Sequence, residues 1–114
     1  MMKMGDAGFL LMESPTRGAQ VSMLTTWTLP KGAKDTFLQD LVAAWRERKD
    51  FAEPFNLRVK PGRVPDWEKL APDDIDMDYH LYHSGLPRPG GERELGVLAS
   101  RLHSLPLDRR RPLW

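Results

Sequence analysis

The strongest constraint on the fold is a change of hydrophobic period across the turn Pro30-Lys31-Gly32. Before the turn, apolar and β-branched residues alternate with their neighbours, which is typical of a β-strand. After it, large apolar residues recur every three or four positions, as in an amphipathic α-helix. These residues are Val21, Met23, Thr25, Trp27 and Leu29 before the turn, and Phe37, Leu38, Leu41, Val42 and Trp45 after it. The pattern predicts a strand over residues 20–29, a helix capped by Asp35, and an α/β fold.

The other predicted elements are short, because prolines interrupt the chain at Pro54, Pro61 and Pro65. The sequence predicts a short helical or irregular segment over residues 6–13, a short strand over residues 57–60 within an irregular excursion, and a second strand over residues 77–83. It also predicts a helix over residues 95–105 that Pro106 ends, with Gly96 packed closely against a neighbour, and the start of a strand at residues 112–114.

Composition excludes several classes of protein. The chain has 114 residues, a formal net charge of +1, 40% hydrophobic residues, 29% charged residues and no cysteine. A balanced charge gives no basis for nucleic-acid binding, and the lack of cysteine excludes disulfides and thiolate chemistry. The apolar run at residues 8–12 is too short to span a bilayer and lacks the cleavage pattern of a signal peptide. We therefore expect a protein of the cytoplasm with a packed core.

The histidines do not form a pattern that predicts a metal site. His80 and His83 lie three residues apart, so on the predicted strand they would point to opposite faces and could not share one ion. His103 lies in the last turn of the predicted second helix, where a partly protonated imidazole suits the negative end of the helix dipole. We expect no metal.

Two charged clusters admit a functional and a structural interpretation. The carboxylates Asp73, Asp74, Asp76 and Asp78 lack the glycine turn and the terminal glutamate of a calcium loop, which favours a solvated loop. The run Arg109-Arg110-Arg111 could hold a phosphate of a donor such as coenzyme A, but pairing with Asp108 and the acidic loop is the favoured interpretation. No nucleophile with an adjacent base can be assembled from these residues, so they name no reaction by themselves.

Three stretches resemble the start of the bacterial wax ester synthase/diacylglycerol acyltransferase family. They are Asp6-Ala7-Gly8-Phe9-Leu10-Leu11-Met12-Glu13-Ser14-Pro15, Asp76-Met77-Asp78-Tyr79-His80-Leu81, and residues 86–114, which run from Leu86-Pro87-Arg88-Pro89-Gly90-Gly91-Glu92 to Arg111-Pro112-Leu113-Trp114. The third stretch is the most specific, because of its length and order. The resemblance covers nearly the whole chain and is weakest over residues 29–65.

The resemblance implies a chloramphenicol-acetyltransferase-like, coenzyme-A-dependent acyltransferase fold with two similar α/β halves. Residues 1–114 would be the N-terminal part of the first subdomain. In the family, a fatty acyl group moves from acyl-coenzyme A to a long-chain alcohol or to diacylglycerol. A His-His-x-x-x-Asp-Gly motif downstream of Pro-Leu-Trp carries the reaction, its second histidine removing the alcohol proton. That motif is absent from these 114 residues, so we expect no catalytic residue in this chain.

The resemblance further implies that Arg111, Pro112, Leu113 and Trp114 position the catalytic loop, with Trp114 packing first and lining an acyl tunnel second. It implies no bound cofactor, acyl-coenzyme A as substrate, and the remaining part of the same polypeptide as partner. A lipid-droplet or inner-membrane surface is a further implied partner. Two alternatives stay open: a peptide-synthetase-like condensation domain, which the Pro-Gly-Gly-Glu and Leu-His-Ser combinations disfavour, and a non-catalytic lipid- or protein-binding remnant of the same fold.

Overall fold

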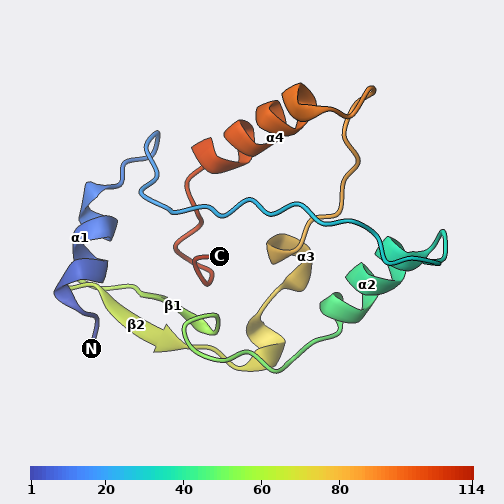
Figure 1. Ribbon diagram of the computed structural model, residues 1–114. Helices are drawn as coiled ribbons and strands as arrows, with labels where there is room; N and C mark the ends of the chain where they lie inside the picture. The colour runs from blue at the N-terminus through green and yellow to red at the C-terminus, as the bar shows by residue number, and fades with distance from the viewer.

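A computed structural model describes the whole chain, residues 1–114, as a set of short elements joined by long connections (Figure 1). The helices are α1 (Met4–Met12), α2 (Phe37–Arg46), the 3-10 helix η1 (Pro72–Asp74), α3 (Met77–His80) and α4 (Glu92–Ser104), and the strands are β1 (Leu57–Lys60) and β2 (Asp66–Lys69). Mixed helix and strand content agrees with the predicted class. The two strands form one antiparallel hairpin, which is the whole of the sheet.

The hairpin lies in the segment where only one strand was predicted. Val59 pairs with Trp67 in its register, and Arg58 faces Glu68, with Arg58 Nε 2.7 Å from Glu68 Oε2. The second strand was missed because its sequence is mostly charged and directly follows Pro65. A proline just before a strand is tolerated, since it removes no N–H from the ladder.

Both long helices form where their periodicity placed them. In α4 the backbone N–H of Gly91 donates to Glu94 Oε2 at 2.8 Å, which satisfies a free donor at the helix start. The predicted cap at Asp35 is wrong, because the residue before α2 is Thr36, whose hydroxyl instead donates to Asp40 Oδ2 at 3.0 Å. The prediction that Gly96 packs closely against a neighbour is also wrong, because a Cβ built there meets no atom within 4 Å.

The predicted strand over residues 20–29 does not form. The segment is extended, but none of the backbone N–H or C=O groups from Val21 to Leu29 makes a hydrogen bond within the chain. Its large side chains are open to solvent, with Trp27 at 88% and Val21 at 90% exposure. The conformation is that of a strand, but no neighbouring strand pairs with it (Figure 1).

The predicted strand over residues 77–83 is wrong, because residues 77–80 form the single helical turn α3. The carboxylate of Asp76 accepts from the backbone N–H of Asp78 at 3.1 Å, and this local cap favours a turn over an unpaired strand. No strand begins at residues 112–114 either, where the chain turns back through a hydrogen bond from the N–H of Trp114 to the carbonyl of Pro112.

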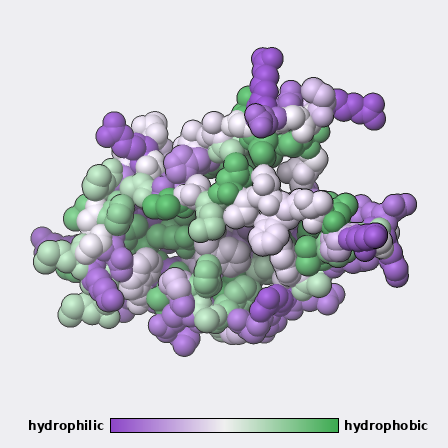
Figure 2. All heavy atoms as spheres, viewed as in Figure 1, coloured by the Kyte–Doolittle hydropathy of each residue, from purple (hydrophilic) through white to green (hydrophobic).

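Few side chains are enclosed. Met2, Leu10 and Ile75 are the buried hydrophobic residues, and the radius of gyration is 16.9 Å, against about 13 Å for a compact domain of this length. Figure 2 accordingly shows hydrophobic residues at the surface among the hydrophilic ones. The expected packed core is therefore small. None of the helices is long and apolar enough to cross a membrane.

Candidate functional site around Arg111 to Trp114

Trp114 is the centre of an aromatic cluster. Its indole stacks on the imidazole of His80 with ring centroids 4.1 Å apart and an interplanar angle of 20°. Phe55 meets the indole edge-on at 6.0 Å, and Phe51 lies at 6.1 Å with a tilt of 39°. The indole Nε1–H donates to the backbone carbonyl of Phe55 at 2.8 Å. Packing and hydrogen bonding thus fix the ring, as expected for an aromatic residue with one polar atom.

His80 holds the same residue through its backbone. Its Nδ1 lies 2.7 Å from the carbonyl oxygen of Trp114, and since a carbonyl only accepts, Nδ1 carries the proton. Burial lowers the pKa of His80 below its ordinary value of 6.5, and the positive charge of Arg111 lowers it further, although the Trp114 carbonyl and Asp76 oppose the shift. The imidazole is therefore neutral at pH 7. Its other nitrogen, Nε2, is buried and has no hydrogen-bond partner.

Arg111 is held by the first residues of the same helical turn. Its Nη1 lies 3.1 Å from Asp76 Oδ2, and its guanidinium carbon lies 4.3 Å from the ring centroid of Tyr79. Desolvation acts to raise the pKa of Asp76. The hydrogen bond from Arg111 and those from the backbone outweigh it, so the pKa lies below its usual value. The ion pair and the cation–π contact together fix the start of the motif.

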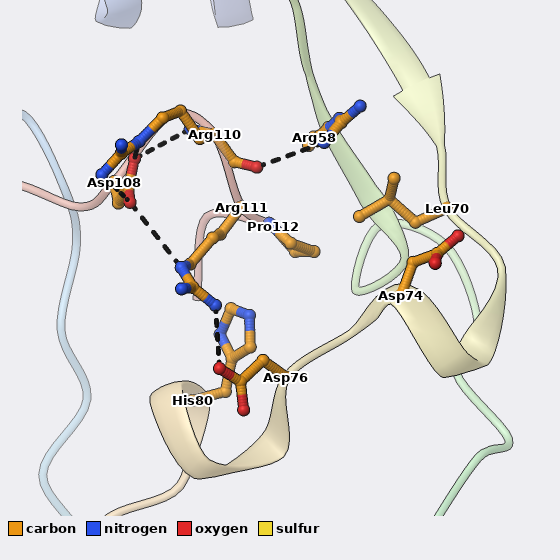
Figure 3. Close-up of a pocket in the computed structure, with 9 residues that line it drawn as sticks. All are labelled: Arg58, Leu70, Asp74, Asp76, His80, Asp108, Arg110, Arg111 and Pro112. Atoms are coloured by element: carbon orange, nitrogen blue, oxygen red, sulfur yellow. Dashed lines mark hydrogen bonds and ion pairs between the residues drawn. The ribbon is translucent and has the colours of Figure 1, made fainter.

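A polar pocket of about 260 Å³ lies beside this cluster (Figure 3). Its arginines are paired: Arg110 Nη2 is 3.0 Å from Asp108 Oδ2, and Arg111 bonds to Asp76. The Arg110 side chain is the main cause that lowers the pKa of Asp108. Arg109 instead reaches back to Glu13 at 3.0 Å, after the end of α1. Pairing with Asp108 and with the acidic loop, predicted from the sequence, is confirmed.

Two further carboxylates of the acidic loop, Asp73 and Asp78, are also paired at the surface. Lys49 Nζ lies 3.2 Å from Asp73 Oδ1, and Arg46 Nε lies 3.8 Å from Asp78 Oδ1, with both carboxylates highly exposed. No group of three or more histidine, cysteine or carboxylate side chains is arranged to hold a metal ion. This describes the solvated loop that the sequence favoured, connected to the end of α2.

A separate apolar groove borders Trp114. Its volume is about 690 Å³, and it is bounded mainly by Trp45, Phe51, Phe55, Met77, Leu81 and Trp114. The groove therefore joins the end of α2 to α3 and to the Arg111–Trp114 motif. Its size is within the usual range for sites that bind small apolar molecules.

The remaining histidines lie outside this site. His83 is exposed and makes no hydrogen bond, whereas His103 lies in the last turn of α4 as predicted. The Nδ1 atom of His103 is 2.6 Å from the hydroxyl of Ser22, and the side-chain amide of Gln20 donates to the His103 carbonyl at 2.6 Å. These contacts fasten the start of the extended segment 20–29 to α4.

The profile of the wax ester synthase/diacylglycerol acyltransferase catalytic domain matches residues 2–114 of the chain. The chain belongs to this family. It is 40% identical over 112 residues to a Mycobacterium tuberculosis protein named for diacylglycerol O-acyltransferase activity, covering 96% of this chain and 22% of that protein. It is 38% identical over 110 residues to the O-acyltransferase WSD of Acinetobacter baylyi, covering 96% and 23%.

The fold is similar to that of a solved family member. The wax ester synthase/diacylglycerol acyltransferase from Marinobacter aquaeolei VT8 superposes with a TM-score of 0.80 and 27% identity, over 96% of this chain and 28% of that one. The family resemblance seen in the sequence is thus confirmed. The chain spans about a quarter of the length of the acyltransferases that it matches.

The structure brings together two stretches that carried the resemblance separately. Arg111 and Trp114 were expected near an active site, whereas His80, Asp76 and Tyr79 were not assigned a role in it. The sequence signal that could have identified these three residues is that all of them lie in the family-like stretch at residues 76–81. Phe51 and Phe55 carried no signal, because they lie in the weakly matching, proline-interrupted region. Within the chain these side chains can position a segment and bind apolar groups, and no nucleophile–base pair lies among them.

Proposed function

We propose that residues 1–114 form the N-terminal part of the first subdomain of an acyl-coenzyme-A-dependent O-acyltransferase. The reaction transfers a fatty acyl group to a fatty alcohol, giving a wax ester, or to diacylglycerol, giving triacylglycerol. The observation that carries this proposal is the family match over residues 2–114, together with the similar fold of the Marinobacter acyltransferase. The relatives named for O-acyltransferase activity supply the reaction class.

In this proposal the chain supplies positioning and binding. The alcohol proton is removed by a histidine of the His-His-x-x-x-Asp-Gly motif, which these residues do not contain. The thioester carbon is attacked by the alcohol oxygen, coenzyme A leaves as the thiol, and no bound cofactor takes part. The role of Arg111, Pro112, Leu113 and Trp114 is to hold the backbone from which that motif follows. The groove beside Trp114 accepts part of a long alkyl chain.

In this proposal the protein surface that the chain binds is the remaining part of the same acyltransferase. The segment from Val21 to Leu29 supports this, since it has free backbone groups and no charged residue lies between Arg17 and Lys31. Natural proteins usually protect such an edge with charges or cover it with another element. We propose that strands of the same acyltransferase cover it, and that Trp27 and Trp45, at 88% and 45% exposure, pack in the same interface. Its lipid substrates place the enzyme at a lipid-droplet or inner-membrane surface.

A second candidate is a non-catalytic lipid-binding remnant of the same fold. The apolar groove of about 690 Å³ beside Trp114 supports it, because such a groove can take up an alkyl chain without any catalytic group. It differs from the first candidate in one respect that can be measured. A remnant binds acyl-coenzyme A or lipid vesicles but does not support acyl transfer when joined to a catalytic segment.

The test is a chimera in which this chain replaces the matching N-terminal segment of the Acinetobacter O-acyltransferase WSD, to which it is 38% identical over 110 residues. Transfer from palmitoyl-coenzyme A to hexadecanol or to dipalmitoylglycerol is followed by the release of coenzyme A and by the lipid product. The proposal expects turnover with either acceptor. A second chimera, with the residues of segment 20–29 replaced by a Gly/Ser linker of equal length, should lose it. A folded chimera of the first kind without turnover would contradict the proposal and favour the lipid-binding remnant.

A further inference from the structure

The side chain of His80 contacts the main chain of Trp114, and this contact joins the two family-like stretches, residues 76–81 and 86–114. Asp76 and Tyr79 hold Arg111 by side chains alone, whereas His80 reaches the carbonyl of Trp114 at 2.7 Å. That carbonyl belongs to the last residue of the Arg111–Trp114 motif. Fixing it therefore fixes the direction of the backbone at the motif's end, in addition to the position of the indole ring.

We propose that His80 is a positioning residue for acyl transfer, acting as a neutral Nδ1–H donor that orients the backbone of Trp114. This rests on the proposed function, in which the backbone beyond Trp114 leads to the catalytic histidines. The imidazole acts in two ways at once. Its face stacks on the indole at 4.1 Å, and its edge donates to the carbonyl of the same residue. One side chain thereby restrains both the ring and the main chain of Trp114.

The surroundings of the ring favour the neutral Nδ1–H form. A proton on Nε2 would put an N–H group on a buried atom that has no acceptor, and an unpaired buried donor is costly. The charged side chains nearest the ring are Arg111 and Asp76, which pair with each other at 3.1 Å, so Asp76 is not free to stabilise an imidazolium; in the proposed acyltransferase a peptide bond follows Trp114, and the oxygen that His80 contacts is an uncharged carbonyl. The neutral Nδ1–H tautomer therefore makes the contact with Trp114 without placing a proton on the buried Nε2.

Residues at the neighbouring positions do not duplicate this contact. His83, three residues further on, is exposed and without a hydrogen bond, so it is a matched control for the loss of an imidazole. Asparagine at position 80 places its amide N–H where Nδ1 stands, at the same number of bonds from Cα. Glutamine places its amide where Nε2 stands, and leucine has the bulk without a donor. The three substitutions separate donation at Nδ1 from simple filling of space.

The experiment measures kcat and KM for the chimera with this chain and for its variants His80→Leu, His80→Gln, His80→Asn and, as control, His83→Leu. A misplaced reacting segment typically costs about 10–100-fold in rate, so we expect that loss of kcat in His80→Leu and His80→Gln. KM for palmitoyl-coenzyme A should stay within about threefold, because positioning acts on the transition state. His80→Asn should recover most of kcat, and His83→Leu should equal the parent. Thermal melts of each variant separate loss of kcat from loss of folding.

Two results would overturn the inference while leaving the proposed function intact. One is an active chimera whose His80→Leu variant keeps the parent kcat. The other is a His80→Asn variant as impaired as His80→Leu. An independent measurement is the ¹⁵N spectrum of the imidazole of His80 in the chimera, where a peptide bond follows Trp114. We expect the Nδ1–H tautomer at pH 7, and the Nε2–H tautomer would refute the assignment whether or not the chimera is active.

Discussion

Replacement of Trp114 by alanine tests the packing at the centre of the site. The substitution removes one stacked, one edge-on and one tilted ring contact, and the indole hydrogen bond to Phe55 at 2.8 Å. Such aromatic pairs contribute about 0.5–1.5 kcal/mol each and a neutral hydrogen bond about 1 kcal/mol. Full burial of a tryptophan would put the loss at about 3–5 kcal/mol. Because Trp114 is only partly buried, we expect about 2–3 kcal/mol.

The assay is urea unfolding of the 114-residue chain followed by circular dichroism, which does not depend on the fluorescence of the substituted residue. With a slope of about 1.5 kcal/mol per molar urea, the expected loss lowers the midpoint by about 1–2 M. Trp27→Ala is the matched control. Trp27 is 88% exposed and its indole bonds only to the Thr25 hydroxyl, so the change should be within about 0.5 kcal/mol. Equal effects of the two substitutions would refute the packing argument.

Three further predictions concern other parts of the chain. Gly96→Ala should stabilise the protein by about 1 kcal/mol in urea unfolding, since a helical Cβ there meets no atom within 4 Å; a loss of stability would contradict the open environment. Lowering the pH from 7 to 5 should destabilise the wild type more than His80→Asn. The pKa of His80 is below 6.5 in the folded chain, so the stability that the neutral imidazole contributes is fully present above pH 6.5 and is lost as the pH falls through the folded-state pKa. Equal pH dependence of the two proteins would argue against a buried neutral imidazole. Glu13→Gln should cost about 1 kcal/mol in the same assay by weakening the contact with Arg109, and Arg109→Ala added to it should cost more, because it also removes the hydrogen bond from Arg109 to the Leu10 carbonyl.

The helices could be predicted from the sequence because their signals are local. The apolar stripe of α2 follows from the spacing of apolar residues along the helical turns. The end of α4 before Pro106 follows from the backbone geometry of proline. The pairing of the arginine run could also be predicted, since opposite charges were available nearby in the sequence and in the acidic loop. The cap at Asp35 failed because Thr36 lies one residue closer to the helix start.

The strands could not be predicted in the same way, because a strand depends on a partner. Residues 20–29 have the alternation and the extended conformation, but no strand of this chain lies beside them. Residues 77–83 alternate as well, yet the Asp76 cap folds the first of them into α3. Conversely, β2 forms with a mostly charged sequence because β1 is close enough to pair with it. Local pattern fixed the backbone preference, and tertiary context decided the pairing.

The site was predicted in part. Arg111 and Trp114 were identified through the family resemblance, and the structure adds the contacts that hold them. The sequence did not reveal the role of His80, because the predicted strand puts it on the face opposite His83 and tests it only as a metal ligand. On a helical turn it faces the motif instead, 34 residues away in sequence. Contacts of that range leave no periodicity in a single sequence.

Acyl transfer by the chimera with the Acinetobacter enzyme tests the central claim most directly. The measurement is the initial rate of wax ester and triacylglycerol formation from palmitoyl-coenzyme A, relative to the parent enzyme. If these 114 residues are the N-terminal part of such an acyltransferase, the chimera should retain activity within about tenfold of the parent, a difference of roughly 1.4 kcal/mol in the barrier. A chimera that folds and melts like the parent, but forms neither product above background, would contradict the account.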